Sequence, residues 1–387
     1  MEDATSGAVP PNLPLDVLQD VVDLALDGLG SEGRELAAAI SLVCRDLRDV
    51  GQKALLTTIT FPRPPHHARS ATPPSPRLAN FVRSLAWSDP QWRAPREEVI
   101  SSQEELFMRT VQRCPRLDRV ELVGYDRHRF VSLLASLSSS FSRTTLSHLT
   151  IAVTAPFTFN GAGTLFTSQD LLEYLLGFPS LKSFAGDVWR LLPDGPSPPL
   201  QSLPLSAVDI SDQVLDSTAA AERRRKPYED FLRAVDPSTL RAVTLFRSWM
   251  YEDLLPLVDS LHFHLTSLTI YSHPGDTTTF FTILPSLLSH QPALQHFSLL
   301  TTDRPLRTDD FSLGDFFRAL WALPPSLQTL TIDFRLDLDE YLLAFFQHGP
   351  CQKLKHARIE TWYTSYTRTW REDLQVYDEV VPPEYLE

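Results

Sequence analysis

The chain is poor in the residues that mark several large classes of protein, beginning with cysteine. Its only three cysteines are Cys44, Cys114 and Cys351, which lie far apart in a chain of 387 residues. This spacing indicates neither a disulfide framework nor a zinc site. We therefore expect all three to be reduced thiols in the core.

Long apolar runs are also missing. No stretch approaches the roughly 18 uninterrupted apolar residues that a membrane helix needs. The N-terminus, MEDATSGAVP, lacks the charged and apolar regions of a secretory signal. We expect a protein of the cytoplasm, the nucleus or both, with no membrane partner.

Positive charge is in deficit, because 35 Lys and Arg face 48 Asp and Glu and the formal net charge is -13. Nucleic acids and anionic membranes attract proteins through a basic field, so we expect no nucleic-acid partner. The one basic run, Arg223 to Lys226, stands beside Glu222 and Glu229. It is typical of a solvated loop, with a nuclear import signal as the alternative.

Catalytic motifs are absent as well. There is no Gly-x-Ser-x-Gly, phosphate-binding loop, dinucleotide fingerprint or His-Glu-x-x-His. Two histidine pairs, His66 with His67 and His262 with His264, have no acidic or cysteine companions in a ligating pattern. We expect no enzyme, no cofactor and no metal; an enzyme with an unrecognised site is the least favoured class.

Near the N-terminus, the sequence predicts two amphipathic helices. Pro14 suits a first helical turn and Asp16 places a negative charge at the positive end of the helix dipole. Apolar residues then recur at spacings of three and four, up to Gly28 and Gly30. A second stripe runs through SLVCRDLRDVGQKALL.

These residues resemble the F-box, in the form common in fungal proteins. The resemblance rests on Leu13-Pro14-Leu15-Asp16-Val17-Leu18, on Ser41-Leu42-Val43-Cys44-Arg45, and on Ala54-Leu55-Leu56 running into a strand at Ile59-Thr60-Phe61. It covers about 50 residues and implies a trihelical module that docks the Skp adaptor of a cullin-RING ubiquitin ligase. The residues that it implies for adaptor binding are Leu13, Pro14, Leu15, Val17, Leu18, Leu42, Val43 and Leu47. As an alternative, the same helices cap the end of a repeat array.

Beyond a proline-rich connector, a short pattern recurs: an apolar residue, two others, an apolar residue, one other and an apolar residue. Ten copies occur, at a mean spacing of about 30 residues. They are Val82-Leu85-Trp87, Leu117-Val120-Leu122, Leu146-Leu149-Ile151, Leu181-Phe184-Gly186, Leu205-Val208-Ile210, Leu240-Val243-Leu245, Leu265-Leu268-Ile270, Leu294-Phe297-Leu299, Leu327-Leu330-Ile332 and Leu354-Ala357-Ile359.

A proline precedes many of these copies by two to four residues, and apolar helical stripes fill the space between them. The prolines are Pro115, Pro179, Pro237, Pro292, Pro325 and Pro350; the helical segments include 106–114, 171–178, 280–290, 316–323 and 341–348. Helix, proline and strand therefore form a repeated unit, which resembles the irregular leucine-rich repeats found behind F-boxes. The implied fold class is α/β, a trihelical module followed by a curved solenoid of parallel strands and outer helices. A doubly wound sheet is the alternative.

The predicted organisation has five parts. Residues 1–12 form a flexible N-terminus, 13–61 the F-box-like module, 62–77 the proline-rich connector and 78–371 the solenoid. Residues 372–387 form an acidic tail, which either frays into solvent or covers the last repeat.

Residues that alternate with the apolar strand positions should face the concave side of the solenoid. They include Arg119, Glu121, His148, Thr150, Asp187, Thr244, Ser267, Thr269, Tyr271, His296, Ser298, Thr329, Thr331, Asp333, His356, Arg358 and Glu360. In four units an aromatic residue stands eight or nine positions after the first apolar residue of the unit. These aromatic residues either line one rim of the solenoid as binding anchors or pack there. The candidate target-binding residues are Tyr125, His148, Trp189, Trp249, Tyr271, His296, Arg358 and Trp362.

The function that this resemblance implies is that of a substrate receptor. The F-box docks the Skp adaptor of the cullin-RING ligase, and the repeats bind a target protein that the sequence does not name. The alternative is a leucine-rich-repeat scaffold outside any ligase, with helices that cap the solenoid.

Overall fold

A computed structural model describes residues 57–61, 73–88, 97–124, 127–153, 168–186, 202–210, 230–246, 263–272, 277–301, 313–333, 354–360, 365–371 and 376–380. The protein is α/β, and its parallel sheet of eleven strands does not close on itself. The chain divides into two compact units, residues 1–121 with 139–145 and residues 122–138 with 146–387. The predicted trihelical module and connector lie outside the described residues, apart from residues 57–61 and 73–77.

The first unit holds β1 (Thr58–Phe61), α5 (Pro76–Ala79), β2 (Ser84–Ser88), α6 (Glu97–Arg113), the start of β3 (Arg119–Gly124) and a 3-10 turn at Phe141–Thr144. Strands β1 and β2 pair in parallel. Three buried aromatic rings lock this unit together, because Phe107 of α6 meets Phe61 and Trp87 edge-on, with centroids 5.4 and 5.9 Å apart. Each edge-to-face pair of this kind stabilises the fold by about 0.5 to 1.5 kcal/mol beyond the burial of its apolar area.

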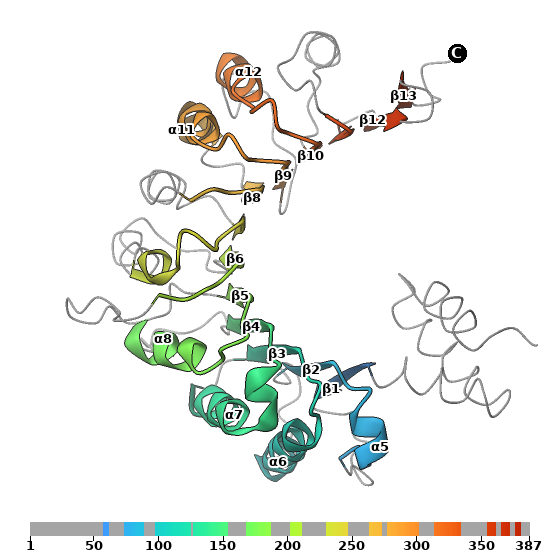
Figure 1. The fold of residues 1–387 in the computed structure, drawn as a ribbon, viewed down its shortest axis with the longest axis vertical. Helices are drawn as coiled ribbons and strands as arrows, with labels where there is room; N and C mark the ends of the chain where they lie inside the picture. The colour runs from blue at the N-terminus through green and yellow to red at the C-terminus, as the bar shows by residue number, and fades with distance from the viewer. Residues whose placement is uncertain are drawn as a thin grey trace, which may run out of the picture. The chain divides into compact units, whose positions relative to one another are not determined.

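The second unit repeats strands and helices in chain order (Figure 1). Its parallel strands are β4 (His148–Val153), β5 (Ser183–Gly186), β6 (Ala207–Ile210), β7 (Ala242–Phe246), β8 (Ser267–Ser272), β9 (His296–Thr301), β10 (Thr329–Asp333) and β11 (His356–Glu360). Its helices are α7 (Arg127–Ser139), α8 (Ser168–Leu176), α11 (Thr277–Ser289) and α12 (Leu313–Trp321). All ten predicted strands are therefore confirmed.

Helices α8, α11 and α12 lie on one side of the strands of this unit (Figure 1). Each presents a buried stripe to the sheet, as in Phe316, Ala319 and Leu320 of α12. A doubly wound sheet carries helices on both faces, so that alternative does not fit the described helices.

A proline turn follows α6, α8, α11 and α12, as predicted. A ladder of backbone hydrogen bonds then joins each unit to the next. The carbonyl just before a strand accepts two N–H groups from the following unit. Ser147 O, for example, accepts from the N–H groups of Lys182 and Ser183, both at 2.9 Å. The same double acceptance recurs at Lys182, Ser206, Arg241, Thr266, Gln295 and Gln328.

Hydroxyl groups add a second set of bonds between units. In three units a Ser or Thr just before the first leucine directs its hydroxyl to the carbonyl of the first leucine in the preceding unit. These pairs are Thr145 to Leu117 at 2.6 Å, Thr239 to Leu205 at 3.0 Å and Ser326 to Leu294 at 2.7 Å. The bonds satisfy carbonyls of fully buried leucines, which would otherwise lose a partner on folding.

The C-terminal end of the sheet departs from the parallel repeat. Strand β12 (Ser365–Arg371) pairs antiparallel with β11, and β13 (Val376–Val380) pairs antiparallel with β12. Residues 376–380 of the acidic tail therefore form a strand of the sheet. The sequence analysis did not predict this hairpin.

Candidate functional site

The face of the second unit's sheet that lies opposite α8, α11 and α12 carries those candidate target-binding residues that the structure describes. We call it the open face. Along its strands, buried apolar residues alternate with more exposed ones, as in Leu268 and Ile270 beside Ser267, Thr269 and Tyr271. This alternation confirms the predicted orientation for the described strand residues of the unit.

Strand register aligns the open-face residues into two rows that cross the sheet. The first row, from β4 to β11, is His148, Ser183, Ala207, Ala242, Ser267, His296, Thr329 and His356. The second row is Thr150, Ala185, Asp209, Thr244, Thr269, Ser298, Thr331 and Arg358. Neighbouring strands lie about 4.8 Å apart, so each row is a regular series of side chains.

The side chains in these rows are short on β5 to β7, in the middle of the unit, and longer on β9 to β11. Strands β5 to β7 contribute Ser, Ala, Thr and a single carboxylate, Asp209, whereas β9 to β11 contribute His296, His356 and Arg358. Short side chains let a partner's bulky groups approach the sheet closely. On β9 to β11, the imidazole and guanidinium groups supply hydrogen-bond donors.

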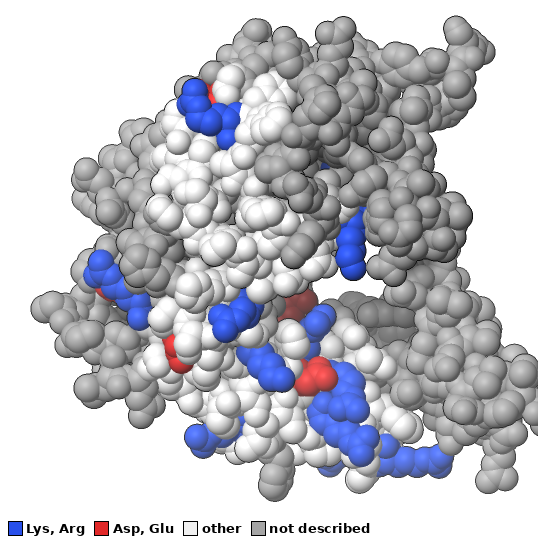
Figure 2. Space-filling view, turned by 45° about the horizontal axis from the view of Figure 1, so that its top comes forward, with Lys and Arg blue, Asp and Glu red and all other residues white. Residues whose placement is uncertain are grey.

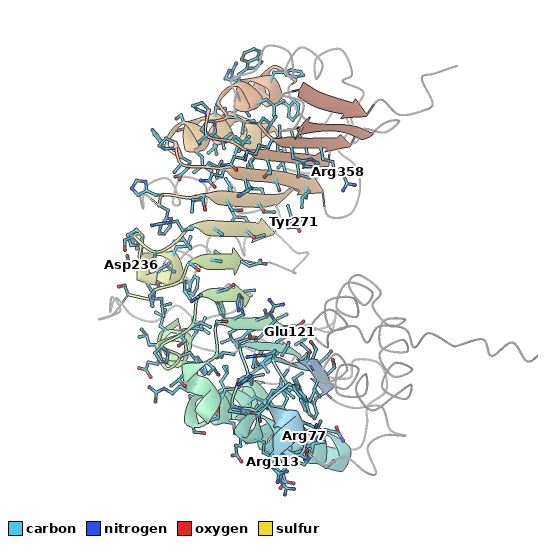
Figure 3. All side chains as sticks on the ribbon, turned by 45° about the vertical axis from the view of Figure 1, so that its right-hand side comes forward. Arg77, Arg113, Glu121, Asp236, Tyr271 and Arg358 are labelled. Carbon is cyan, nitrogen blue, oxygen red and sulfur yellow. The ribbon has the colours of Figure 1, made fainter. Side chains whose placement is uncertain are left out.

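Two histidines of the first row have close neighbours. His296 Nδ1 lies 2.7 Å from Thr329 Oγ1 on the adjacent strand, and His148 Nδ1 lies 2.7 Å from Ser147 Oγ. These contacts orient both rings on the open face. Tyr271 on β8 is half-buried, and its register neighbour on β9 is Leu300. Tyr271 and Arg358 are labelled in Figure 3.

Four of the eight candidate target-binding residues thus belong to the open face: His148, Tyr271, His296 and Arg358. The other four, Tyr125, Trp189, Trp249 and Trp362, lie outside the described residues. So do all eight candidate adaptor-binding residues, which are Leu13, Pro14, Leu15, Val17, Leu18, Leu42, Val43 and Leu47.

Sequence reasoning missed Asp209, the only carboxylate of the two rows. It lies on β6 between Ala185 and Thr244 and is half-buried. The alternation rule could have found it, because Asp209 stands between the apolar positions Val208 and Ile210.

The part of the chain described contains no group of three or more His, Cys, Asp or Glu that could hold a metal ion. Burial raises the pKa of the Cys114 thiol to about 12, which keeps it protonated and unreactive. The pKa of Asp236 is lowered by hydrogen bonds from the hydroxyl and backbone N–H of Ser238. Asp236 lies in a turn before β7, outside the open face (Figure 3).

Comparisons with known proteins leave the family open, since no family model and no curated protein matches the chain. Among the described helices, none combines the length and the apolar character needed to cross a membrane.

Proposed function

We propose that the protein is a noncatalytic substrate receptor of a Skp, cullin and F-box ubiquitin ligase. The observation that carries this proposal is the ordered pair of blocks, Leu13 to Leu18 and Ser41 to Arg45, ahead of an array of strand and helix units. The array is a leucine-rich-repeat-like solenoid, in which each unit buries its apolar face against its neighbours. The protein works inside the cell, in the cytoplasm, the nucleus or both.

In this proposal the two parts of the chain have different partners. The eight apolar or proline residues of the F-box-like module dock the Skp adaptor, and the cullin-RING subunits supply catalysis. The open face holds the target protein. Its small central side chains, with histidines and Arg358 at one end, support binding of a structured protein surface, because they combine close approach with a few directional donors.

Copurification with the Skp adaptor tests the proposal. The wild-type chain is compared with a Leu15→Asp, Leu18→Asp variant, which puts two carboxylates into the predicted apolar interface. The matched control, Ser267→Asp with Thr331→Asp, adds the same two charges on the open face. Capture by the wild type and the control, with loss in the first variant, supports the proposal. Failure of a folded wild-type chain to capture the adaptor, or equal capture by all three, refutes it.

The second candidate is a scaffold outside any ligase, whose N-terminal helices cap the array. One observation favours it: β1, at the end of the F-box-like segment, pairs with β2 as part of the sheet. Deleting residues 1–61 would therefore also remove the buried side chains of Ile59 and Phe61. Point substitutions separate the two candidates better, since in a cap Leu15→Asp with Leu18→Asp would lower the melting temperature of the whole chain.

A further inference from the structure

Four exposed arginines surround one turn of the first unit. Arg83 stands just before β2, Arg113 ends α6, Arg116 is in the following turn and Arg119 begins β3. We call these four residues the arginine cluster. Backbone bonds hold the segments together, because Arg83 O accepts from the N–H groups of Asp118 and Arg119 at 2.9 and 3.0 Å.

The guanidinium groups of the cluster have no carboxylate partner within the described part of the chain. Arg83 Nη1 donates to the carbonyl of Arg116 at 3.3 Å, which leaves its other N–H groups available. Neither Arg113, Arg116 nor Arg119 makes an ion pair there. By contrast, Arg109 of the same helix pairs with Glu105.

Two acidic residues, Asp118 and Glu121, lie close to the cluster in sequence. Asp118 is half-buried and has an interaction of its own, and Glu121 lies two residues beyond Arg119 on β3 without forming an ion pair. Figure 2 shows Lys and Arg side chains close together on one face, with Asp or Glu side chains beside them. A concentration of positive charge is unexpected in a chain whose net charge is -13.

Stabilisation of the fold accounts for Arg113 and, through its bond to the Arg116 carbonyl, for part of the role of Arg83. Arg113 lies in the last turn of α6, where a cation interacts favourably with the helix dipole. Arg116 and Arg119 follow the helix, and Arg83 precedes a strand, so the dipole does not explain them.

We propose that the arginine cluster binds a carboxylate-rich segment of a partner protein. Guanidinium groups match carboxylates through two parallel hydrogen bonds, and four of them in neighbouring segments suit an extended chain with repeated Asp or Glu. This surface belongs to the first unit and is distinct from the open face. The proposal therefore does not depend on membership of a ubiquitin ligase.

Nucleic acid fits the cluster less well. Binding of single strands combines a basic groove with exposed aromatic rings for stacking. In the described part of the first unit, Phe61, Trp87 and Phe107 are all buried in the core, and Phe81 is half-buried, so none of these rings is fully exposed for stacking. The acidic remainder of the chain would also repel a long phosphate backbone, whereas a short acidic segment meets only the local field.

Fluorescence anisotropy with a fluorescein-labelled oligoglutamate peptide tests the proposal, with the full chain at low ionic strength. The variant Arg83→Gln, Arg116→Gln, Arg119→Gln removes three charges and keeps long polar side chains. The control Arg109→Gln, Arg143→Gln, Arg318→Gln makes the same change in net charge elsewhere. We expect the cluster variant to bind about tenfold more weakly than the wild type and the control to change less than about twofold.

Three results would overturn the proposal. They are no binding of oligoglutamate by the wild type, equal weakening in the two triple variants, and tighter binding of labelled oligothymidine that the cluster variant loses. The last result would assign the surface to nucleic acid. Circular dichroism melting of both variants confirms that they are folded.

Discussion

The ring of Phe184 fills the space that a side chain at Gly186 would occupy. A Cβ placed on Gly186 would lie 2.9 Å from Cζ of Phe184 and 2.8 Å from the carbonyl oxygen of Ile151 on β4. The Phe184 ring also packs against Phe231, with centroids 5.3 Å apart. Gly186 stands where most units have an apolar side chain, and the larger Phe184, two residues before it on the same face, supplies the missing volume.

Replacing Gly186 with Ala should therefore destabilise the protein. The added methyl group meets a backbone carbonyl and a packed ring, and overpacking of this kind costs about 1 to 3 kcal/mol. Urea denaturation measures the change as a lower midpoint. Relative to Phe184→Leu alone, adding Gly186→Ala should cost less than it does in the wild type, since the ring contact is gone and only the carbonyl contact remains.

Ala185→Ser is the matched control for Gly186→Ala, because it adds one atom to the same strand on the open face. It should change the free energy of unfolding by less than about 0.5 kcal/mol. If Gly186→Ala were as stable as the wild type, the close packing described here would be wrong.

The hydroxyl of Thr239 should contribute measurably to stability. Thr239→Val keeps the shape of the side chain but removes the hydroxyl, which lies 3.0 Å from the carbonyl oxygens of both the buried Leu205 and Asp236. An unsatisfied buried acceptor costs about 1 to 3 kcal/mol. Differential scanning calorimetry should show a lower melting temperature.

Thr244→Val makes the same chemical change on the open face. Within the described part of the chain the Thr244 hydroxyl has no hydrogen-bond partner, so we expect little loss of stability. Equal losses of stability in the Thr239 and Thr244 variants would contradict this prediction. They would mean that the threonine hydroxyls act through hydration and not through the hydrogen bond between units.

Cys114 should resist alkylation in the folded protein. Its side chain is fully buried, and burial raises the pKa of its thiol from 9.0 to about 12. Iodoacetamide at pH 8 should modify Cys114 only after unfolding, as measured by mass spectrometry of the peptide that contains it. Rapid labelling of Cys114 in the native chain would contradict its burial.

The raised pKa of the Cys114 thiol should make the stability of the protein depend on pH in the alkaline range. The unfolded thiol loses its proton near pH 9, whereas the folded thiol keeps its proton until about pH 12. The contribution of Cys114 is therefore fully present below pH 9 and is lost as pH rises toward 12, by at most about 1.4 kcal/mol per pH unit. Cys114→Ala should flatten this part of the pH profile in urea denaturation, and an unchanged slope would count against the burial argument.

Asp236 should titrate below the usual range of an aspartate. The Ser238 hydroxyl and N–H both bond its ionised carboxylate, at 2.7 and 2.8 Å, and lower its pKa. The stabilisation is present at neutral pH and is lost as pH falls through the lowered pKa. In Ser238→Ala the pKa should rise toward 3.8, as measured by carboxyl carbon NMR. No difference between the two chains would contradict the role of the hydroxyl.

Local apolar spacing was enough to locate the repeated strands. In Leu327-Leu330-Ile332, for example, three buried side chains and a preceding proline mark one turn and one strand of β10. The face of each residue followed from the same pattern, because side chains of a strand alternate. His296 and Arg358 could thus be placed on the open face before their neighbours were known.

The C-terminal hairpin was not predictable in the same way. Strands β12 and β13 lack the leucine spacing of the units, and their antiparallel pairing depends on contacts with β11. The arginine cluster was missed for a related reason. Arg83 and Arg119 are 36 positions apart in the chain and meet only because adjacent strands start at the same edge of the sheet.

The sequence by itself determined the strand and helix units and their order, because each unit needs only a local apolar pattern and a proline turn. Tertiary structure decided what depends on register between units: the rows of the open face, the bond from Thr239 to Leu205, the space that Phe184 takes at Gly186, and the arginine cluster. These features join residues about 25 to 36 positions apart or require exact packing distances. A one-dimensional pattern does not specify such distances, and the stacked sheet does.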